Sequence, residues 1–338
     1  MIALILAGGS GTRFWPLSTD KLQKQFLTLF DNKSMLKLTY ERLLSFLPKE
    51  NIFVVTTYDQ VPLVYDYLPE LNVCQLIVEP CGMNTGPCIA LSIAYLLWNY
   101  NREERVLVLP ADHYIPDTEM FKEYINKADE LAKDNILITF GIKPTYPATG
   151  YGYIEQGEKI TDGMFHVKQF KEKPNFELAK IFLEHGNYLW NSGIFCFSIF
   201  SIIQSFEKYC KSLFEKVVEV SCINDIKIKK QKYSEIQKLS IDIEIFEKAD
   251  NVAVIPVDFI WSDVGNWSSL HDLMVKDENN NYFTNSSFSL NSKNNYIKSN
   301  KFVALIGIEN LIFVETDDSI LICNKNDAEL VKEIKIPQ

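Results

Sequence analysis

A glycine-rich loop followed by two cations is the part of this sequence best suited to chemistry. The loop directly follows the apolar run Ile2–Leu6 and reads Ala7-Gly8-Gly9-Ser10-Gly11-Thr12-Arg13. Glycines let the backbone turn sharply and expose its N–H groups, and Arg13 and Lys24 add positive charge suited to a polyphosphate. The loop therefore predicts a nucleotide-binding site.

The loop matches neither of the two common phosphate-binding patterns. A Walker loop would end in Gly-Lys-Ser/Thr, whereas this loop ends Gly11-Thr12-Arg13. A dinucleotide fingerprint would need a third glycine where Phe14 stands. A P-loop kinase and a nicotinamide enzyme are therefore not supported, and an ordinary turn between a strand and a helix remains the alternative for the glycines alone.

Two aspartates follow apolar runs and offer a second kind of chemistry. Asp112 comes shortly after Val106–Leu109, and Asp263 comes after the apolar stretch that ends at Ile260. Two carboxylates together with phosphate oxygens make a suitable ligand set for Mg²⁺. Taken singly, each aspartate is more commonly a cap or turn residue.

Two further segments carry groups suited to a sugar phosphate. Glu172-Lys173-Pro174 offers an acceptor for hydroxyls beside a donor for an anion, and the amide of Asn191 can donate and accept. The alternative for the first segment is an exposed charged turn, and Trp190 is predicted to fill the core. His113 adjoins Asp112, but no other histidine is spaced to make it catalytic.

These groups need a sheet to position them, and the first half of the chain predicts one. Strand-like runs alternate with helical stretches: Ile2–Leu6, Ser34–Leu47, Ile52–Val55, Leu76–Val78, Thr85–Trp98 and Val106–Leu109. Such alternation predicts βαβ units and a largely parallel sheet. Because ligands collect at the carboxyl ends of parallel strands, the glycine loop and the segment around Asp112 should converge on one crevice.

The rest of the chain predicts shorter elements. Strands are expected at Tyr151–Ile154 and Phe165–Phe170, and the run Lys227–Lys232 is expected on a solvated helix face. The Asn- and Ser-rich stretch 277–301 indicates a linker or irregular turns. Three short apolar runs then predict a small C-terminal β unit, at Phe302–Ile306, Leu311–Val314 and Ile320–Cys323.

Composition narrows the class of protein. A chain of 338 residues with 47% hydrophobic residues can bury a sizeable core. Its formal net charge of −10 disfavours nucleic acid as a partner, so an anionic ligand must be held by local cations. The apolar start of the chain, Met1–Leu6, lacks the basic leader of a signal peptide, and this apolar run is too short to span a bilayer. We therefore expect no membrane contact and a cytoplasmic location.

Taken together and in order, the motifs resemble mannose-1-phosphate guanylyltransferases across nearly the whole chain. The matching segments are GGSGTRFWPLS from Gly8, KQF from Lys24, EPCGMNTGP from Glu79, LPADH from Leu109, TFGIKPTYPATGYGYI from Thr139, FKEKP from Phe170, WNSGIFCF from Trp190, SIDIEIFEK from Ser240 and WSDVGNW from Trp261.

The resemblance implies an α/β fold with two domains. Residues 1–276 would form a Rossmann-like sugar-nucleotidyltransferase domain of the glycosyltransferase-A-like type, a mixed sheet flanked by helices. Residues 277–338 would form a small left-handed β-helix-like unit. Many relatives carry a further isomerase domain of the cupin type, and the chain is expected to be a short form without it. The C-terminal unit is a candidate pairing surface for a homodimer, because short β units leave edges that seek partners.

The resemblance also implies roles for individual residues. The guanine or ribose would be contacted by Leu6, Ala7, Gly8, Gly9, Ser10, Gly11, Thr12, Glu79, Pro80 and Asn84, with Gln25 near the ribose. Arg13 and Lys24 would hold the triphosphate of GTP. Asp112 and Asp263 would bind Mg²⁺, with Asp112 also among the nucleotide-binding residues. Mannose 1-phosphate would be surrounded by Tyr151, Gly152, Glu172, Lys173 and Asn191.

The implied reaction transfers GMP from GTP to α-D-mannose 1-phosphate and is catalysed by Arg13, Lys24, Asp112 and Asp263. One alternative keeps the chemistry but uses another sugar 1-phosphate or another nucleoside triphosphate. A second alternative, from another class, is a regulatory subunit that binds GDP-mannose without catalysis.

Three positions depart from the family pattern. Gln23 stands where the family usually has proline, and Thr19 and Met83 stand where it usually has arginine. Loss of the cation at Met83 would weaken a nucleotide or phosphate contact, and Gln23 would loosen the loop that presents Lys24.

Overall fold

The protein is described by a computed structural model covering residues 1–9, 11–132 and 135–334. Contacts divide it into two compact units. The first unit comprises Met1–Gly8, Leu36–Ala111 and Ile115–Trp261. The second unit comprises Gly9–Met35, Asp112–Tyr114 and the chain from Ser262 onward. Among the described residues, no helix is both long enough and apolar enough to cross a membrane.

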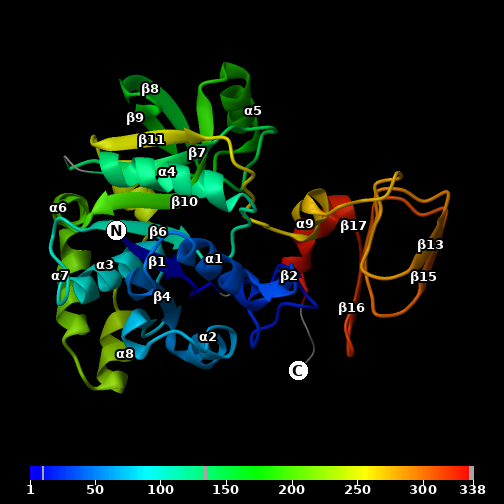
Figure 1. Ribbon diagram of the computed structural model, residues 1–338, viewed down its shortest axis with the longest axis horizontal. Coiled ribbons are helices and arrows are strands. Elements are labelled where there is room, and N and C mark those ends of the chain that lie inside the picture. Colours follow the sequence, from blue (N-terminus) through cyan, green and yellow to red (C-terminus); the bar gives the residue numbers. More distant parts are fainter. Residues whose placement is uncertain (10, 133–134, 335–338) are drawn as a thin grey trace. The chain divides into compact units, whose positions relative to one another are not determined.

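A mixed sheet forms the centre of the first unit (Figure 1). Its nine strands run in the order β5-β4-β1-β6-β10-β7-β11-β9-β8. Their bounds are β1 Ile2–Leu6, β4 Ile52–Thr57, β5 Leu76–Glu79, β6 Arg105–Pro110, β7 Leu137–Ile142, β8 Tyr153–Thr161, β9 Met164–Lys171, β10 Tyr188–Ser198 and β11 Val252–Val257. Strands β5, β4, β1 and β6 are parallel, which confirms the predicted βαβ arrangement. Strand β10 runs antiparallel to β6 and β7, so the sheet is mixed.

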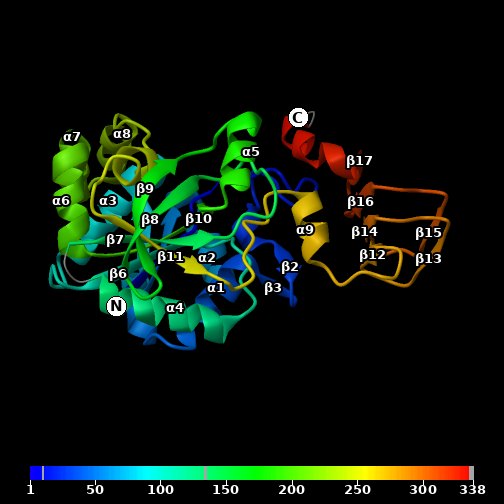
Figure 2. The same ribbon diagram turned by 90° about the horizontal axis from the view of Figure 1, so that it is seen from above.

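Helices cover both faces of this sheet. Helix α4 lies on one face, and α3, α6 and α7 pack on the other (Figure 2). The bounds are α1 Met35–Leu44, α2 Val61–Tyr67, α3 Thr85–Leu96, α4 Thr118–Leu131, α5 Phe176–His185, α6 Ile199–Tyr209, α7 Lys211–Ser221, α8 Ile226–Ser234 and the π-helical turn η5 Asp242–Phe246. Helix α3, within the predicted helical stretch Thr85–Trp98, is buried along nearly its whole length. Most lysines of α8 are exposed, as expected for a solvated face.

The second unit contains the stretch with Lys24 and a small β-helix. Its elements are η1 Lys24–Phe26, β2 Thr28–Phe30, β3 Lys33–Ser34, α9 Trp267–Leu273, β12 Tyr282–Phe283, β13 Ser287–Leu290, β14 Tyr296–Lys298, β15 Val303–Ile306, β16 Leu311–Glu315, β17 Ile320–Asn324 and η6 Lys325–Glu333. Strands β12, β14 and β16 form one parallel ladder, and β13 and β15 form another (Figure 2). The predicted C-terminal β unit is confirmed.

The prediction of a linker or irregular turns at 277–301 is wrong, because β12, β13 and β14 lie there. Asparagine supports these strands at the corners of the β-helix. Asn280, Asn294 and Asn310 adopt left-handed backbone, which asparagine tolerates well. The amide of buried Asn295 donates to Asn281 Oδ1 at 2.8 Å and accepts from the N–H of Leu311 at 2.8 Å. Stacked asparagines therefore satisfy the buried backbone of the turns.

Candidate active site

The glycine loop is anchored within the second unit just beyond its last glycine. Phe14 is fully buried and packs edge-on against Trp267, with ring centroids 4.9 Å apart. The indole N–H of Trp267 donates to the carbonyl of Trp15 at 3.0 Å, and the N–H of Phe14 donates to Ser18 Oγ at 3.0 Å. The residue that replaces a third glycine therefore fixes the loop to the start of α9.

The loop glycines are neither strained nor crowded. Gly8, Gly9 and Gly11 all lie outside the left-handed region. A Cβ atom added at these positions would meet its nearest neighbour at 3.7, 3.9 and 3.5 Å, which is ordinary contact. Neither backbone strain nor close packing among the described residues therefore requires glycine at these three positions. Ser10 lies outside the described residues.

The end of strand β1 is held by its neighbours in the first unit. The N–H of Ala7 donates to the carbonyl of Val55 at 2.7 Å, and the carbonyl of Leu6 accepts from the N–H of Ala111 at 3.0 Å. Leu6 and Ala7 therefore continue the pairing of β1 with both adjacent strands. Asp112 follows Ala111 directly in sequence, at the end of β6.

Lys24, Asp112 and Asp263 meet in the second unit, and we call them the cation cluster. The Lys24 ammonium lies 2.8 Å from Asp112 Oδ2 and also donates to the backbone carbonyl of Asp263. The Lys24 side chain is only 11% exposed, so the ion pair is shielded. Burial raises the pKa of Asp112, but the charges of Lys24 and His113 and the bond from Lys24 outweigh it and leave the pKa lowered. Asp112 is therefore held as a carboxylate.

Strained backbone follows two of the predicted site carboxylates. Ten described residues other than glycine have positive φ, and eight of them are asparagine or aspartate. The exceptions are Lys173, at φ 44°, and Val264, at φ 46°, which directly follow Glu172 and Asp263. Such a conformation is a genuine outlier for a β-branched residue such as valine, and outliers of this kind cluster at functional sites.

The stretch that presents Lys24 is braced although it lacks the family proline. The Gln23 amide donates to the carbonyl of Asp20 at 2.6 Å, and Thr19 Oγ1 accepts from the N–H of Leu22 at 3.2 Å. Gln25 is buried and donates from Nε2 to the carbonyl of Gly9 at 3.1 Å. Side-chain bonds thus replace the stiffness that proline would provide.

Thr12 and Arg13 differ from Lys24 in their exposure. Both side chains are exposed. Within the described part of the chain, the Arg13 guanidinium makes no ion pair, whereas the Lys24 ammonium contacts Asp112. Arg13 therefore keeps its positive charge uncompensated and open to an anionic ligand.

Glu79 ends strand β5 in the first unit and is almost completely buried. Its Oε1 accepts from the Tyr233 hydroxyl at 2.9 Å and from the N–H of Met83 at 3.2 Å. Burial raises the pKa of Glu79 to about 7, although bonds from Tyr233, Met83 and Cys88 oppose the rise. Its Oε2 would lie 3.7 Å from a Cβ at Gly8. Glu79 therefore lies beside the first loop glycine.

The segment after Glu79 and Pro80 leads into helix α3. Asn84 adopts φ 76° and caps the helix by accepting the N–H of Thr85 at 2.8 Å. Met83 is only 3% exposed and belongs to the hydrophobic core. The family arginine is thus replaced at a position that here fills the core.

Gly152, Glu172 and Asn191 lie together in the first unit, and we call them the amide cluster. The N–H of Asn191 donates to the carbonyl of Gly152 at 2.8 Å. A Cβ added at Gly152 would lie 2.6 Å from Glu172 Oε2 and 3.3 Å from the Asn191 Cβ. Three of the five predicted sugar-binding residues are therefore in contact.

The other two predicted sugar-binding residues flank this cluster. Lys173 forms an ion pair with Glu172 Oε1 at 2.5 Å, and its own side chain is 62% exposed. The Tyr151 ring lies 5.1 Å from that of Trp190 and 5.3 Å from that of Trp261. Trp190 is 5% exposed, which confirms its predicted place in the core.

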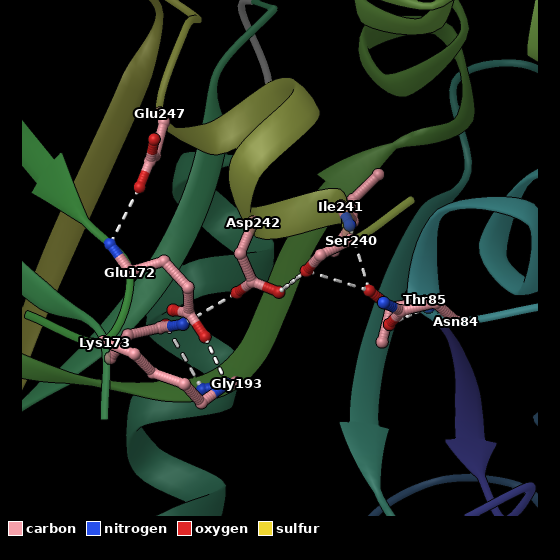
Figure 3. Close-up of polar contacts among 10 residues, drawn as sticks. Asn84, Thr85, Glu172, Lys173, Gly193, Ser240, Ile241, Asp242 and Glu247 are labelled. Carbon is pink, nitrogen blue, oxygen red and sulfur yellow. Dashed lines mark hydrogen bonds and ion pairs between the residues drawn. The ribbon is translucent and has the colours of Figure 1, made fainter. Parts of the chain in front are cut away.

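One neighbour of the amide cluster was not singled out by the sequence. Asp242, at the start of η5, accepts from Asn191 Nδ2 at 2.9 Å and from Ser240 Oγ at 2.8 Å (Figure 3). Burial raises the pKa of Asp242, and burial together with the charge of Asp242 raises the pKa of Glu172. The only sequence signal for Asp242 is its membership of the SIDIEIFEK segment.

Comparison with known proteins assigns the chain to a family. The family described as nucleotidyl transferase matches residues 2–280, and the mannose-phosphate isomerase/GMP-like beta-helix domain matches residues 286–335. The "Mannose-1-phosphate guanylyltransferase 2" of Escherichia coli O157:H7 is 38% identical over 350 residues, covering 99% of this chain and 72% of that protein. A mannose-1-phosphate guanylyltransferase of Salmonella muenchen is 39% identical with the same coverage.

A solved structure agrees with the sequence relatives. A protein of Thermus thermophilus described as a mannose-1-phosphate geranyltransferase has a TM-score of 0.89 and 31% identity. The match covers 98% of this chain and 97% of that one. The domain boundary at residues 276 and 277 stays a prediction. The chain belongs to the mannose-1-phosphate guanylyltransferase family of nucleotidyltransferases.

Proposed function

We propose that this protein transfers GMP from GTP to α-D-mannose 1-phosphate and releases GDP-mannose and pyrophosphate. Membership of the family supports the reaction class. The geometry of the cation cluster supports placing the catalysis at Lys24, Asp112 and Asp263. In that cluster a buried ammonium is held between the carboxylate of Asp112 and the backbone of Asp263. A pure binding module would not need a buried cation held against a carboxylate and a backbone carbonyl.

The nucleotide would be held by the loop and by Glu79. The absence of side chains at the loop glycines would allow phosphate oxygens to approach the backbone closely, and exposed Arg13 adds charge. Glu79 supports a preference for guanine, because a carboxylate accepts hydrogen bonds and guanine offers two adjacent N–H donors. Because the pKa of Glu79 is raised, a further donor at its carboxylate would favour the ionised form.

Asp112 and Asp263 would hold Mg²⁺. Nucleotidyltransferases typically use a divalent metal, and the donor set suits one, because the Asp112 carboxylate and the backbone carbonyl of Asp263 already converge on one cation, the Lys24 ammonium. Within the described ranges, no three acidic, histidine or cysteine side chains gather around a metal position, so the remaining ligands would be phosphate oxygens and water. When bound, the ion would neutralise charge on the phosphates.

The protein's own groups have little covalent chemistry to perform. A phosphate monoester is mostly dianionic near neutral pH, its second pKa being about 6, so mannose 1-phosphate attacks the α-phosphorus without a general base. Lys24 and Arg13 would bind and align the triphosphate, and Lys173 would attract the sugar phosphate. This accounts for a site without a catalytic histidine.

Pyrophosphate release from a panel of nucleoside triphosphates and sugar 1-phosphates tests the proposal. We expect release with GTP and mannose 1-phosphate in the presence of Mg²⁺ and its loss with a chelator. Release only with another pair would keep the reaction class and replace the substrates. No release with any pair, together with GDP-mannose binding, would favour the regulatory subunit. The cytoplasmic location and the homodimer stay predictions from the sequence.

A further inference from the structure

The segment Leu239–Asp242, which we call the strap, has no role in the reaction described so far. It is tied to the start of helix α3 at two points: the N–H of Gly86 donates to the carbonyl of Leu239 at 2.9 Å, and the N–H of Ile241 donates to Thr85 Oγ1 at 2.9 Å (Figure 3). Ser240 Oγ then donates to Asp242 Oδ2 at 2.8 Å. The strap is thus anchored to α3, and its Ser240 hydroxyl holds the Oδ2 oxygen of Asp242 in place.

The other carboxylate oxygen of Asp242 fixes the amide of Asn191. Asn191 Nδ2 donates to Asp242 Oδ1 at 2.9 Å, while the N–H of Gly193 donates to Asn191 Oδ1 at 3.2 Å. The Thr139 hydroxyl lies 3.0 Å from the same Oδ1. A donor on the oxygen side and an acceptor on the nitrogen side together determine which way the amide faces.

This bonding leaves one group of Asn191 unused. An amide nitrogen has two N–H bonds, and only the bond to Asp242 has a partner among the described residues. Beside it in the amide cluster, Glu172 has Oε1 bound to Lys173 while its Oε2 lies against Gly152. A donor and an acceptor side by side suit a sugar, because adjacent hydroxyls can accept from one and donate to the other.

We propose that Asp242 is a positioning residue for sugar recognition, which holds the Asn191 amide so that its second N–H is available to a hydroxyl of the sugar phosphate. The inference rests on the proposed function, which supplies mannose 1-phosphate as the substrate. Asp242 acts through Asn191. Without the carboxylate, the amide could turn over or lose its alignment, and the donor next to Glu172 would be lost.

Steady-state kinetics of Asp242→Ala in the full chain tests the proposal. We expect the KM for mannose 1-phosphate to rise about 10- to 100-fold, the range that loss of a buried hydrogen-bond partner produces, with the KM for GTP within about twofold. The matched control is Glu244→Ala, which removes a carboxylate of the same turn η5 whose partner is Lys248. It should leave both KM values unchanged.

A double variant separates positioning from mere stability and remains informative where the alanine variant does not fold. Asn191→Asp/Asp242→Asn exchanges donor and acceptor, so the pair and the bond from Gly193 are both kept. We expect a Tm close to that of the wild type, with the KM for mannose 1-phosphate still raised at least about tenfold, because the side chain at position 191 no longer carries an N–H.

The results of these experiments distinguish the role of Asp242 from the proposed transferase function on which that role rests. A folded Asp242→Ala with wild-type KM values, an equal rise in Glu244→Ala, or a double variant with wild-type KM overturns the role of Asp242 while the transferase stands. A wild-type protein that forms no GDP-mannose overturns the proposed function, and the inference falls with it.

Discussion

The cation cluster and the amide cluster both contain a partly buried carboxylate, yet the surroundings shift the pKa of the two carboxylates in opposite directions. In the cation cluster, the Lys24 ammonium keeps the pKa of Asp112 below its ordinary value in spite of burial. In the amide cluster, burial and the charge of neighbouring Asp242 raise the pKa of Glu172, and burial raises the pKa of Asp242 itself. A site that must attract phosphate and a metal needs fixed charge, whereas a site that recognises neutral hydroxyls needs aligned donors and acceptors.

The largest expected effect comes from removing the charge that sets the cation cluster apart. Lys24→Ala should lower kcat by about 10²–10³, the loss seen when one preorganised group that stabilises transition-state charge is removed. The measurement is the rate of GDP-mannose formation at saturating substrates. Lys21→Ala is the matched control, because Lys21 is an exposed lysine three residues earlier in the same stretch. If Lys24→Ala kept a turnover near that of the wild type, the charge of Lys24 would not be what distinguishes the cation cluster from the amide cluster.

A second test asks whether burial governs the carboxylates of the first unit, using Glu79. Its pKa is raised from 4.5 to about 7, so between these values the folded state holds a proton that the unfolded state has lost. The free energy of unfolding should therefore fall as the pH rises from 4.5 through 7, by at most about 3 kcal/mol for a difference of about 2.5 in pKa. In Glu79→Gln this part of the pH dependence should be absent.

Chemical denaturation at several pH values measures this effect. The control is Glu130→Gln, which changes the net charge equally at an exposed position of α4. If wild type and Glu79→Gln lose stability in parallel between pH 5 and pH 8, burial does not set the protonation of Glu79.

The smallest expected effect concerns alignment in the amide cluster alone. The added Cβ of Gly152→Ala would lie 2.6 Å from Glu172 Oε2, so the carboxylate must move. We expect the KM for mannose 1-phosphate to rise about tenfold, equivalent to about 1.4 kcal/mol, while the KM for GTP stays unchanged. In the control Gly150→Ala, no atom lies within 4 Å of the new Cβ. Equal effects of the two variants would mean that alignment is not limiting.

The sequence predicted most of the fold because its strands are marked by local signals. Each apolar run of the first half, from Ile2–Leu6 to Val106–Leu109, became a strand of the parallel part of the sheet or a helix beside it. The Asn-rich corners were missed for a physical reason. Asparagine is favoured in turns of many kinds, and bonds across the β-helix such as that between Asn281 and Asn295 are seen only in the folded structure.

The site was predicted less completely than the fold. Motifs found Gly152, Glu172 and Asn191, and the structure joins them. They gave no role to Asp242, because its partner Asn191 is 51 residues away and the contact depends on how η5 packs. The bracing of the Lys24 stretch by Gln23 was equally hidden, since a glutamine replacing a proline indicates greater freedom until its bond to Asp20 is known.

The strap also has a consequence for how this protein can change through evolution. A Cβ at Gly86 would lie 2.8 Å from the carbonyl oxygen of Leu239, so no larger side chain fits there unless the strap shifts. Because the strap also carries Asp242, a mutation at the start of α3 would be felt at Asn191. Substitutions at the start of α3 and at Asn191 should therefore show epistasis, and tolerated changes there would come in pairs.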